Sequence, residues 1–390
     1  MAKEMASRME RLGTETAFEV LARAKKLEAA GKSVVHLEIG EPDFDTPANI
    51  VEAAVKALKN GATHYGPSAG LPEAREGFAK WFSKDRGVEV DSDQIVITPG
   101  AKPIIYFVLT ALVQEGDEVI YPNPGFPIYE SMIHFTGAKA VPLPLREENG
   151  FSIDPQELRR LANDKTKLII INTPGNPCGG VLSPEDLQAV ADVAKEHDCW
   201  VLSDEIYSKI IYDRKHHSML EIEGMQDRTI VLDGHSKTYA MTGWRLGFGV
   251  MPHSLAPSIA RLQTNSTSCT STFTQLAGVE ALLGDQSGAQ AMVKEFKERR
   301  DLVVGLLNEV PGVSCLTPGG AFYVFPNIKK LGVPCREFAS TLLDEYGVAA
   351  LAGTSFGSFG DGYLRFSYAN SRENLAEGVS RLKAYAETLA

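Results

Sequence analysis

One lysine, Lys237, follows a short apolar segment of the chain and is followed eight residues later by an arginine. A lysine amine at the end of a buried strand is poorly solvated. Its pKa therefore falls, and the neutral amine can react with a carbonyl carbon. Arg245, between Gly243 and Gly247, offers a fork of N–H donors that suits a phosphate. The pair suggests a phosphorylated aldehyde cofactor, although on these residues alone Lys237 can equally be a solvated surface lysine.

Further phosphate donors stand at the junction between an apolar segment and a helical one. Gly100, Ala101 and Lys102 occupy this junction, where free backbone N–H groups and the helix dipole favour an anion. The alternative for this motif is an ordinary tight turn. Ser236, directly before Lys237, adds a hydroxyl that can donate to the same group.

An acid, a phenol, an amide and an aromatic ring follow other apolar segments. Asp204 comes directly after a buried segment, so its carboxylate needs a cationic partner such as a pyridinium nitrogen, unless it caps the next turn. Tyr207 can then donate to a ring oxygen, and Asn176 has its amide aimed by a neighbouring glycine and proline. Phe126, in a proline-rich turn, offers a face for a ring to stack on, or belongs to the core.

Arg365 stands inside an apolar segment, residues 363–369 (YLRFSYA). A guanidinium in such surroundings is costly unless it meets an anion. A substrate carboxylate, bound by both ends of the fork, answers that cost, and a structural salt bridge is the alternative. His216 and His217 lie in a charged segment, and we expect both on the surface.

The elements that must hold these residues alternate between apolar segments and helical ones. Continuous apolar strands separated by helices are typical of a mostly parallel, doubly wound sheet that is buried on both faces. Right-handed crossovers place the loops after the strands at the carboxyl edge of such a sheet, where ligands bind. The predicted strands are residues 94–98, 118–121, 168–171, 200–202, 229–232 and 248–251.

The two ends of the chain differ in character from this middle part. Residues 5–31 read as one helix, followed by a strand at 33–39. After about residue 285, helices and strands alternate as in a smaller α+β unit. The expected organisation is an N-terminal segment that packs with the small domain, a large cofactor-binding domain and a small C-terminal domain, at residues 1–46, 47–285 and 286–390.

Composition limits the partners and the compartment. The 390 residues carry 39 Lys and Arg against 50 Asp and Glu, a net charge of −11, which disfavours nucleic acid and anionic membranes. No apolar stretch reaches the length of a membrane helix, and the N-terminus lacks the apolar core of a signal peptide. Five scattered cysteines indicate neither disulfides nor a metal site, and favour the cytoplasm.

The motifs taken together resemble those of a known family, the class I aminotransferases, which are pyridoxal-phosphate enzymes of fold type I. The likeness is greatest to the bacterial aspartate-aminotransferase-like subgroup and runs over nearly the whole chain. The segments that carry it are GEPDFDTP, THYGPSAGLPEAR, NTPGNPCGG, SDEIY, SKTYAMTGWRLG and YLRFSYA.

This resemblance implies a role for each candidate residue. Lys237 matches the lysine that carries pyridoxal phosphate, and Asp204 the partner of the ring nitrogen. Arg365 matches the holder of the substrate α-carboxylate, beside the backbone of Gly40. The other matches are Tyr207 and Asn176 for the ring hydroxyl, Arg245 for the phosphate, and Tyr65 for the phosphate of the other subunit in a homodimer.

The predicted function is transfer of an α-amino group between an L-amino acid and a 2-oxo acid by a ping-pong mechanism. Residues 262–275, where relatives place an arginine for a second carboxylate, contain no Lys or Arg. A broad donor range follows, unless a lysine from another loop supplies the charge. The alternatives are a β-lyase, decarboxylase or oxidase on the same fold and, outside catalysis, a ligand sensor. Cys178 and His235 depart from the family pattern and leave their roles open.

Overall fold

Seven strands form the main sheet in the computed structural model of the protein, which describes residues 4–389. Their order is β2-β8-β7-β6-β5-β3-β4, and β8 alone among them runs antiparallel to its neighbours. The predicted mostly parallel sheet is therefore confirmed. The strands are β2 (Ile95–Thr98), β3 (Glu118–Asn123), β4 (Lys139–Pro144), β5 (Thr166–Asn172), β6 (Trp200–Asp204), β7 (Thr229–Gly234) and β8 (Gly247–Val250).

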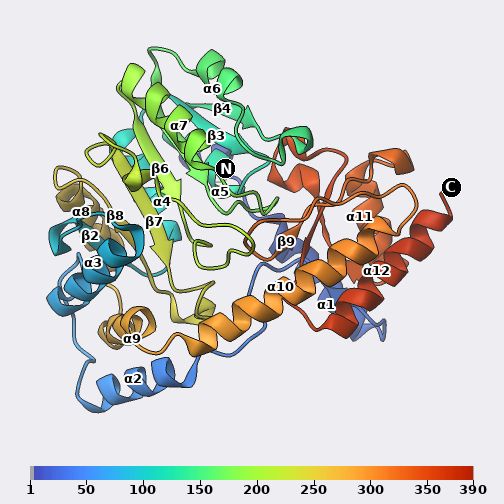
Figure 1. Ribbon diagram of the computed structural model, residues 1–390, viewed down its shortest axis with the longest axis horizontal. Coiled ribbons are helices and arrows are strands. Elements are labelled where there is room, and N and C mark those ends of the chain that lie inside the picture. Colours follow the sequence, from blue (N-terminus) through green and yellow to red (C-terminus); the bar gives the residue numbers. More distant parts are fainter. Residues whose placement is uncertain (1–3, 390) are drawn as a thin grey trace.

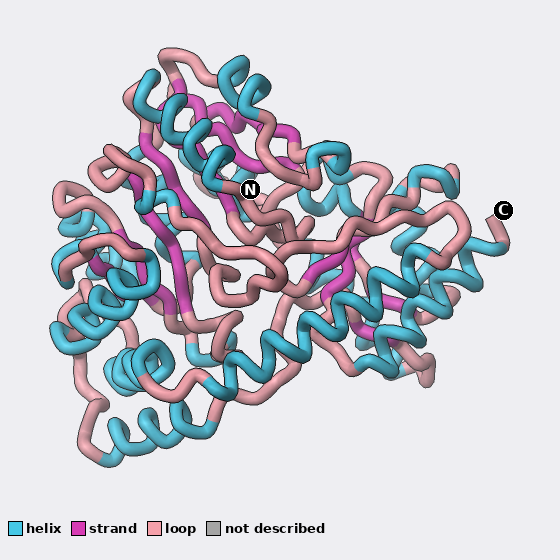
Figure 2. The backbone as a smooth tube through the Cα atoms, viewed as in Figure 1, coloured by secondary structure: helices cyan, strands magenta, loops and turns pink. Residues whose placement is uncertain are grey.

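Both faces of this sheet are covered, which explains why its strands are continuously apolar. In β5, Leu168 and Ile170 pack on one face, while Ile169 and Ile171 pack on the other. Figures 1 and 2 show the strands enclosed by helices. The first face carries α4 (Lys102–Leu112), α5 (Ile128–Thr136) and α8 (Ala256–Thr267), and the second carries α3 (Pro72–Arg86), α6 (Pro155–Leu161), α7 (Pro184–Glu196) and α9 (Thr272–Leu283). Helix α2 (Ala48–Lys59) packs on α9.

A smaller α+β part is built from both ends of the chain, as predicted. Strand β1 (Val35–His36) pairs in parallel with β10 (Val348–Ala349). A three-stranded antiparallel sheet has the order β11-β12-β9. Its strands are β9 (Tyr323–Val324), β11 (Leu351–Ala352) and β12 (Leu364–Ser367), and the helices of this part are α1 (Thr16–Ala29), α10 (Ser287–Asn308), α11 (Cys335–Asp344) and α12 (Arg372–Glu387). In Figure 1 the long helix α10 runs from beneath the main sheet to α12.

Two predictions for the N-terminal region are wrong. The expected helix over residues 5–31 is broken by an extended stretch after η1, where the Gly13 N–H donates to Ser131 Oγ at 2.9 Å instead of continuing a helix. The expected strand 33–39 shrinks to two residues. Leu37 still bonds to the backbone of Ala349 and Ser367, but at the next residue the Glu38 carbonyl accepts from the Arg365 side chain. Residues 1–3 and 390 of the expected domains lie outside the described residues.

Short 3-10 helices complete the elements. They are η1 (Ser7–Arg11), η2 (Ser92–Gln94), η3 (Glu147–Asn149), η4 (Met219–Glu221), η5 (Thr242–Trp244), η6 (Lys329–Leu331), η7 (Gly353–Phe356) and η8 (Ser358–Gly360). Among residues 4–389, every helix is too short or too polar to cross a membrane.

Candidate active site

A cavity of about 430 Å³ opens at the carboxyl ends of the parallel strands and gathers most of the candidate residues. Gly100 lies directly behind the guanidinium of one of them, Arg245. Tyr65 is not part of the lining, and it is 90% exposed. The candidates that line the cavity are Gly40, Ala101, Lys102, Phe126, Asn176, Asp204, Tyr207, Ser236, Lys237, Arg245 and Arg365.

Lys237 reaches the cavity from the loop after β7. Its Nζ donates to the Gly40 carbonyl at 2.6 Å. Burial lowers the pKa of this lysine to about 8, so a far larger share of it is neutral near pH 7 than of an ordinary lysine. Gly40 needs to be a glycine, because a Cβ there would overlap the Tyr323 hydroxyl. The Lys237 amine is thus held in place and able to act as a nucleophile.

Asp204 ends β6 and is buried in the cavity wall. Tyr129 donates from its hydroxyl to Asp204 Oδ2 at 2.6 Å, and the Ile206 N–H donates to Oδ1 at 3.2 Å. Burial raises the pKa of Asp204 to about 6. Asp204 does cap the following turn through the Ile206 N–H. Within residues 4–389, however, no cationic side chain forms an ion pair with its carboxylate, whereas Glu205 and Asp233 both pair with Arg86. Tyr129 was not among the sequence candidates, although it lies one turn after Phe126.

Arg365 and Tyr207 bring the two parts of the protein together at the cavity. Arg365 Nη1 donates to Asn176 Oδ1 at 3.3 Å, and its Nη2 donates to the Glu38 carbonyl. Its Nε is buried with no partner, and no described residue forms a salt bridge with it. An incoming anion therefore suits this guanidinium. Tyr207 exchanges a hydroxyl hydrogen bond with Tyr323 at 2.8 Å, and Tyr323 is a further residue that the motifs did not indicate.

A concave set of donors lies at the start of α4. Arg245 adopts a left-handed backbone conformation (φ 54°), and its Nη1 donates to the Thr242 carbonyl at 2.7 Å. Gly100 (φ 89°) leaves room for this guanidinium, which a Cβ would collide with. Gly247 likewise lies against the backbone of Gly100 and Ala101. The missing side chains open a space between N–H groups and a guanidinium that suits a phosphate.

Lys102 is tied to the N-terminal part of the chain. Its ammonium forms an ion pair with Glu15, at the start of α1, and lies 5.4 Å from the ring centre of Phe126. The side chain is 46% exposed, so it stands at the cavity mouth. Ser236 is buried beside Lys237.

These residues fit pyridoxal phosphate. The buried Asp204 carboxylate has no cationic partner among the described residues, the N–H groups and guanidinium around Gly100 suit an anion, and Lys237, with a lowered pKa, lines the same cavity. Each of these needs is one that a phosphorylated pyridine aldehyde meets.

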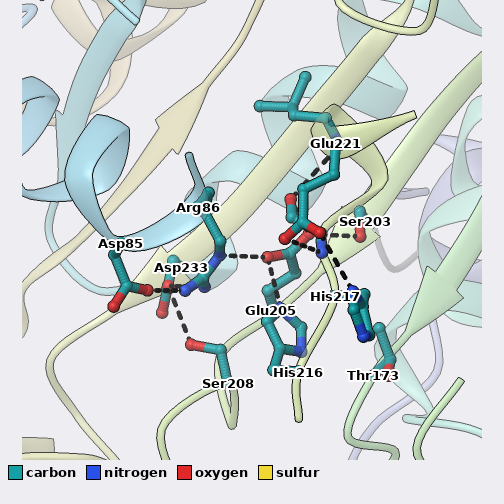
Figure 3. Close-up of polar contacts among 12 residues, drawn as sticks. Asp85, Arg86, Thr173, Ser203, Glu205, Ser208, His216, His217, Glu221 and Asp233 are labelled. Atoms are coloured by element: carbon teal, nitrogen blue, oxygen red, sulfur yellow. Dashed lines mark hydrogen bonds and ion pairs between the residues drawn. The ribbon is translucent and has the colours of Figure 1, made fainter. Parts of the chain in front are cut away.

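His216 is not on the surface, contrary to the prediction from its charged surroundings. It is 9% exposed, and its Nε2 lies 2.8 Å from Glu205 Oε2 (Figure 3). Two other residues left open by the sequence are also buried. Burial raises the pKa of the Cys178 thiol and lowers the pKa of His235 to about 4, so neither ionises near neutral pH.

Comparisons with known proteins agree with this geometry. The family model for class I and II aminotransferases matches residues 32–382. The aspartate aminotransferase of Pyrococcus horikoshii is 42% identical, over 94% of this chain and 93% of its own. The aromatic-amino-acid aminotransferase 2 of Thermococcus litoralis is also 42% identical, over 90% and 91%. The aspartate aminotransferase from Thermus thermophilus, solved with maleate, superposes with a TM-score of 0.93 at 35% identity, over 98% and 100%. The chain belongs to the class I and II aminotransferases.

Proposed function

We propose that the cavity residues divide the work of amino-group transfer as their contacts suggest. As a member of its family the protein is a pyridoxal-phosphate-dependent aminotransferase. The observation that carries the assignment of roles is that a buried carboxylate without an ion-pair partner and a partly buried lysine face one cavity with an unpaired guanidinium. Asp204, Lys237 and Arg365 are then the three residues on which the reaction depends.

The roles follow from the atoms that each residue offers. When bound, pyridoxal phosphate supplies the electron-accepting ring that stabilises charge at the substrate α-carbon. Arg365 binds the α-carboxylate with its free N–H groups, beside the Gly40 backbone. Lys237 Nζ takes the proton from the α-carbon, a general-base step that its lowered pKa favours. Asp204 holds the proton on the ring nitrogen.

The remaining residues orient the cofactor. Tyr207 and Asn176 lie at the wall where the ring hydroxyl would sit, and Phe126 offers the face on which the ring stacks. The phosphate would be bound by Arg245. Further donors to it are the Ser236 hydroxyl and the backbone N–H groups of Gly100, Ala101 and Lys102.

A single-turnover experiment tests the assignment. Purified enzyme loaded with the cofactor is mixed with one amino acid and no acceptor, and the expected products are a 2-oxo acid and the aminated cofactor in equal amounts. A β-lyase, decarboxylase or oxidase would release other products and leave the aldehyde form.

We further propose a broad range of amino donors. The relatives are named for aspartate and for aromatic amino acids. Among the described residues that line the cavity, Lys102 is the lysine at its mouth, and it already has Glu15 as its partner. A second carboxylate on the substrate must compete with Glu15, so neutral donors are at little disadvantage. A panel of donors with one common acceptor measures this range.

The quaternary structure and compartment are also proposals. The Tyr65 ring is 90% exposed, and α2 exposes Val51, Val55 and Leu58 beside other apolar side chains, which supports a homodimer in which Tyr65 serves the neighbouring site. The division at residues 46 and 285 and a cytoplasmic location belong to the same proposal. Sedimentation of the wild type, and mixing of Tyr65→Phe with Lys237→Ala subunits, test the shared site.

A further inference from the structure

The residue after Asp204 faces the opposite side of the main sheet. Asp204 lines the cavity, whereas Ser203 and Glu205 point toward the face that α3 covers. Figure 3 shows Glu205 in the middle of a group of polar side chains on this side. Glu205 is fully buried and has no contact with the cavity. The mechanism described above does not use it.

Four groups hold the Glu205 carboxylate, so it is both fixed and charged. Burial alone would raise the pKa of Glu205, but the neighbouring His216 and Arg86 lower it to about 2. The donors are Ser203 Oγ at 3.0 Å and Ser218 Oγ at 2.7 Å to Oε1, and Arg86 Nε at 3.1 Å and His216 Nε2 at 2.8 Å to Oε2.

The same group of residues joins the two strand ends that deliver Asp204 and Lys237. Arg86, the last residue of α3, also donates from Nη2 to Asp233 Oδ2 at 3.3 Å, four residues before Lys237 in the chain. The Glu205 N–H donates to the Leu232 carbonyl of the neighbouring strand at 2.8 Å. A movement of Glu205 would therefore displace both strand ends.

We propose that Glu205 is a positioning residue for the reaction, whose buried negative charge acts through the adjacent Asp204 on the protonated ring nitrogen that Asp204 holds. A second negative charge behind the first makes the loss of that proton less favourable. In agreement, Glu205 adds to burial in raising the pKa of Asp204. The inference rests on the role of Asp204 proposed above.

The alternative is that Glu205 only stabilises the fold through Arg86, and a double variant separates the two. Glu205→Gln keeps the shape of the side chain but removes one of the two buried carboxylates that face Arg86, so this variant alone should be less stable, although Asp233 and Asp85 still pair with the arginine. Adding Arg86→Met removes the buried cation as well. Asp233, whose pKa burial raises to about 7, can then take up a proton, so the double variant should recover part of the stability. Arg300→Met in α10, which removes a buried arginine paired with Asp301 in the same helix and with Asp213 outside it, is the matched control.

Two titrations report on Asp204 directly. In cofactor-free protein, the infrared carboxyl band that Asp204→Asn removes gives the pKa of Asp204 independently of any transamination assay. In loaded enzyme, the absorbance of the lysine-bound cofactor is followed against pH.

The double variant should lower both titrations by at least half a pH unit and reduce kcat about tenfold or more, with KM for the amino donor within threefold. The Arg300→Met control should match the wild type in all of these. A folded double variant whose Asp204 titration or kcat equals that of the wild type would overturn the proposal. Failure of transamination in the wild type, with the infrared shift still present, would instead overturn only the proposed function.

Discussion

Asp204 and Glu205 are consecutive buried carboxylates that lie on the two faces of the main sheet and have different partners there. On the cavity face, Asp204 has a phenol and a backbone N–H as donors, and its pKa rises to about 6. On the other face, Glu205 has the Arg86 guanidinium, the His216 ring and two hydroxyls as partners, and its pKa falls to about 2. The two carboxylates are almost equally buried, so the difference in pKa comes from their partners. Asp204 is therefore the one that needs a ligand with a positive charge.

Asp204 and Arg365 on the cavity face have no ion-pair partner among the described residues, whereas Glu205 and Arg86 on the other face pair with each other. Arg365 Nε has no partner, whereas Arg86 contacts three carboxylates, those of Asp85, Glu205 and Asp233. An incomplete set of contacts costs stability in the free protein and is completed when a ligand binds. Substitutions on the cavity face should therefore reduce activity, and those on the other face should first reduce stability.

The largest effect is expected on the cavity face, for Lys237→Ala. The variant loses both the amine that binds the cofactor covalently and the base that moves the α-proton, so kcat should fall by at least about four powers of ten. Borohydride reduction of the wild type should fix the cofactor to Lys237, as peptide mass spectrometry would show. The exposed Lys383→Ala is the control, and a Lys237→Ala enzyme with measurable wild-type turnover would contradict the assignment.

Asp204→Ala should follow, because it removes the group that keeps the ring nitrogen protonated. We expect a loss of two to four powers of ten in the α-proton step, about 3–5 kcal/mol of barrier. The primary deuterium isotope effect with α-deuterated substrate should increase as this step becomes limiting. Activity within tenfold of wild type would mean that Asp204 is only a turn cap.

The pH dependence of stability should differ in sign between the two carboxylates. Glu205, with a lowered pKa, stabilises the fold above about pH 4.5 and loses this contribution as the pH falls toward 2, so Glu205→Gln should cost about 3 kcal/mol at pH 7 and less in acid. Asp204, with a raised pKa, destabilises the cofactor-free fold above about pH 6 and not below its unfolded value of 3.8. Asp204→Asn should therefore gain up to about 3 kcal/mol at pH 7, and the gain should vanish near pH 4.

Urea unfolding of the cofactor-free variants at several pH values measures both contributions. If the two substitutions change stability in the same direction at pH 7, the contrast between the two faces is wrong.

Much of the fold could be predicted because the signals are local. The apolar runs 168–171 and 229–232 follow from burial on both faces. Asp204 and Lys237 were found because each lies within a few residues after an apolar run, 200–202 for Asp204 and 229–232 for Lys237. Tyr129 and Glu205 could not be found, because their roles depend on contacts with residues far away in the chain. The break between η1 and α1 was missed for the same reason.

The smallest expected effect concerns the cavity mouth, where Lys102 forms an ion pair with Glu15. Wild-type kcat/KM for aspartate should exceed that for alanine or phenylalanine by less than about a hundredfold, near 2.7 kcal/mol. Glu15→Gln frees the Lys102 ammonium for a second carboxylate. Because the pair is partly exposed, the preference for aspartate should rise only about threefold to fivefold.

Lys102→Gln should remove that gain in the double variant. An aspartate preference above a hundredfold in the wild type would show that a cation other than the paired lysine meets the second carboxylate.

The parallel pairing of β1 with β10 has a consequence for synthesis of the protein. Val35 lies beside Val348, so this small sheet joins one segment to another that is synthesised more than 300 residues later. The Gly40 carbonyl that holds Lys237 follows β1, and Arg365 follows β10 and β11. The main sheet can form while the chain is still growing, but the cavity closes only after release of the C-terminal strands, when this long loop has been closed at its entropic cost. A nascent chain therefore carries the lysine well before it has a complete pocket around it.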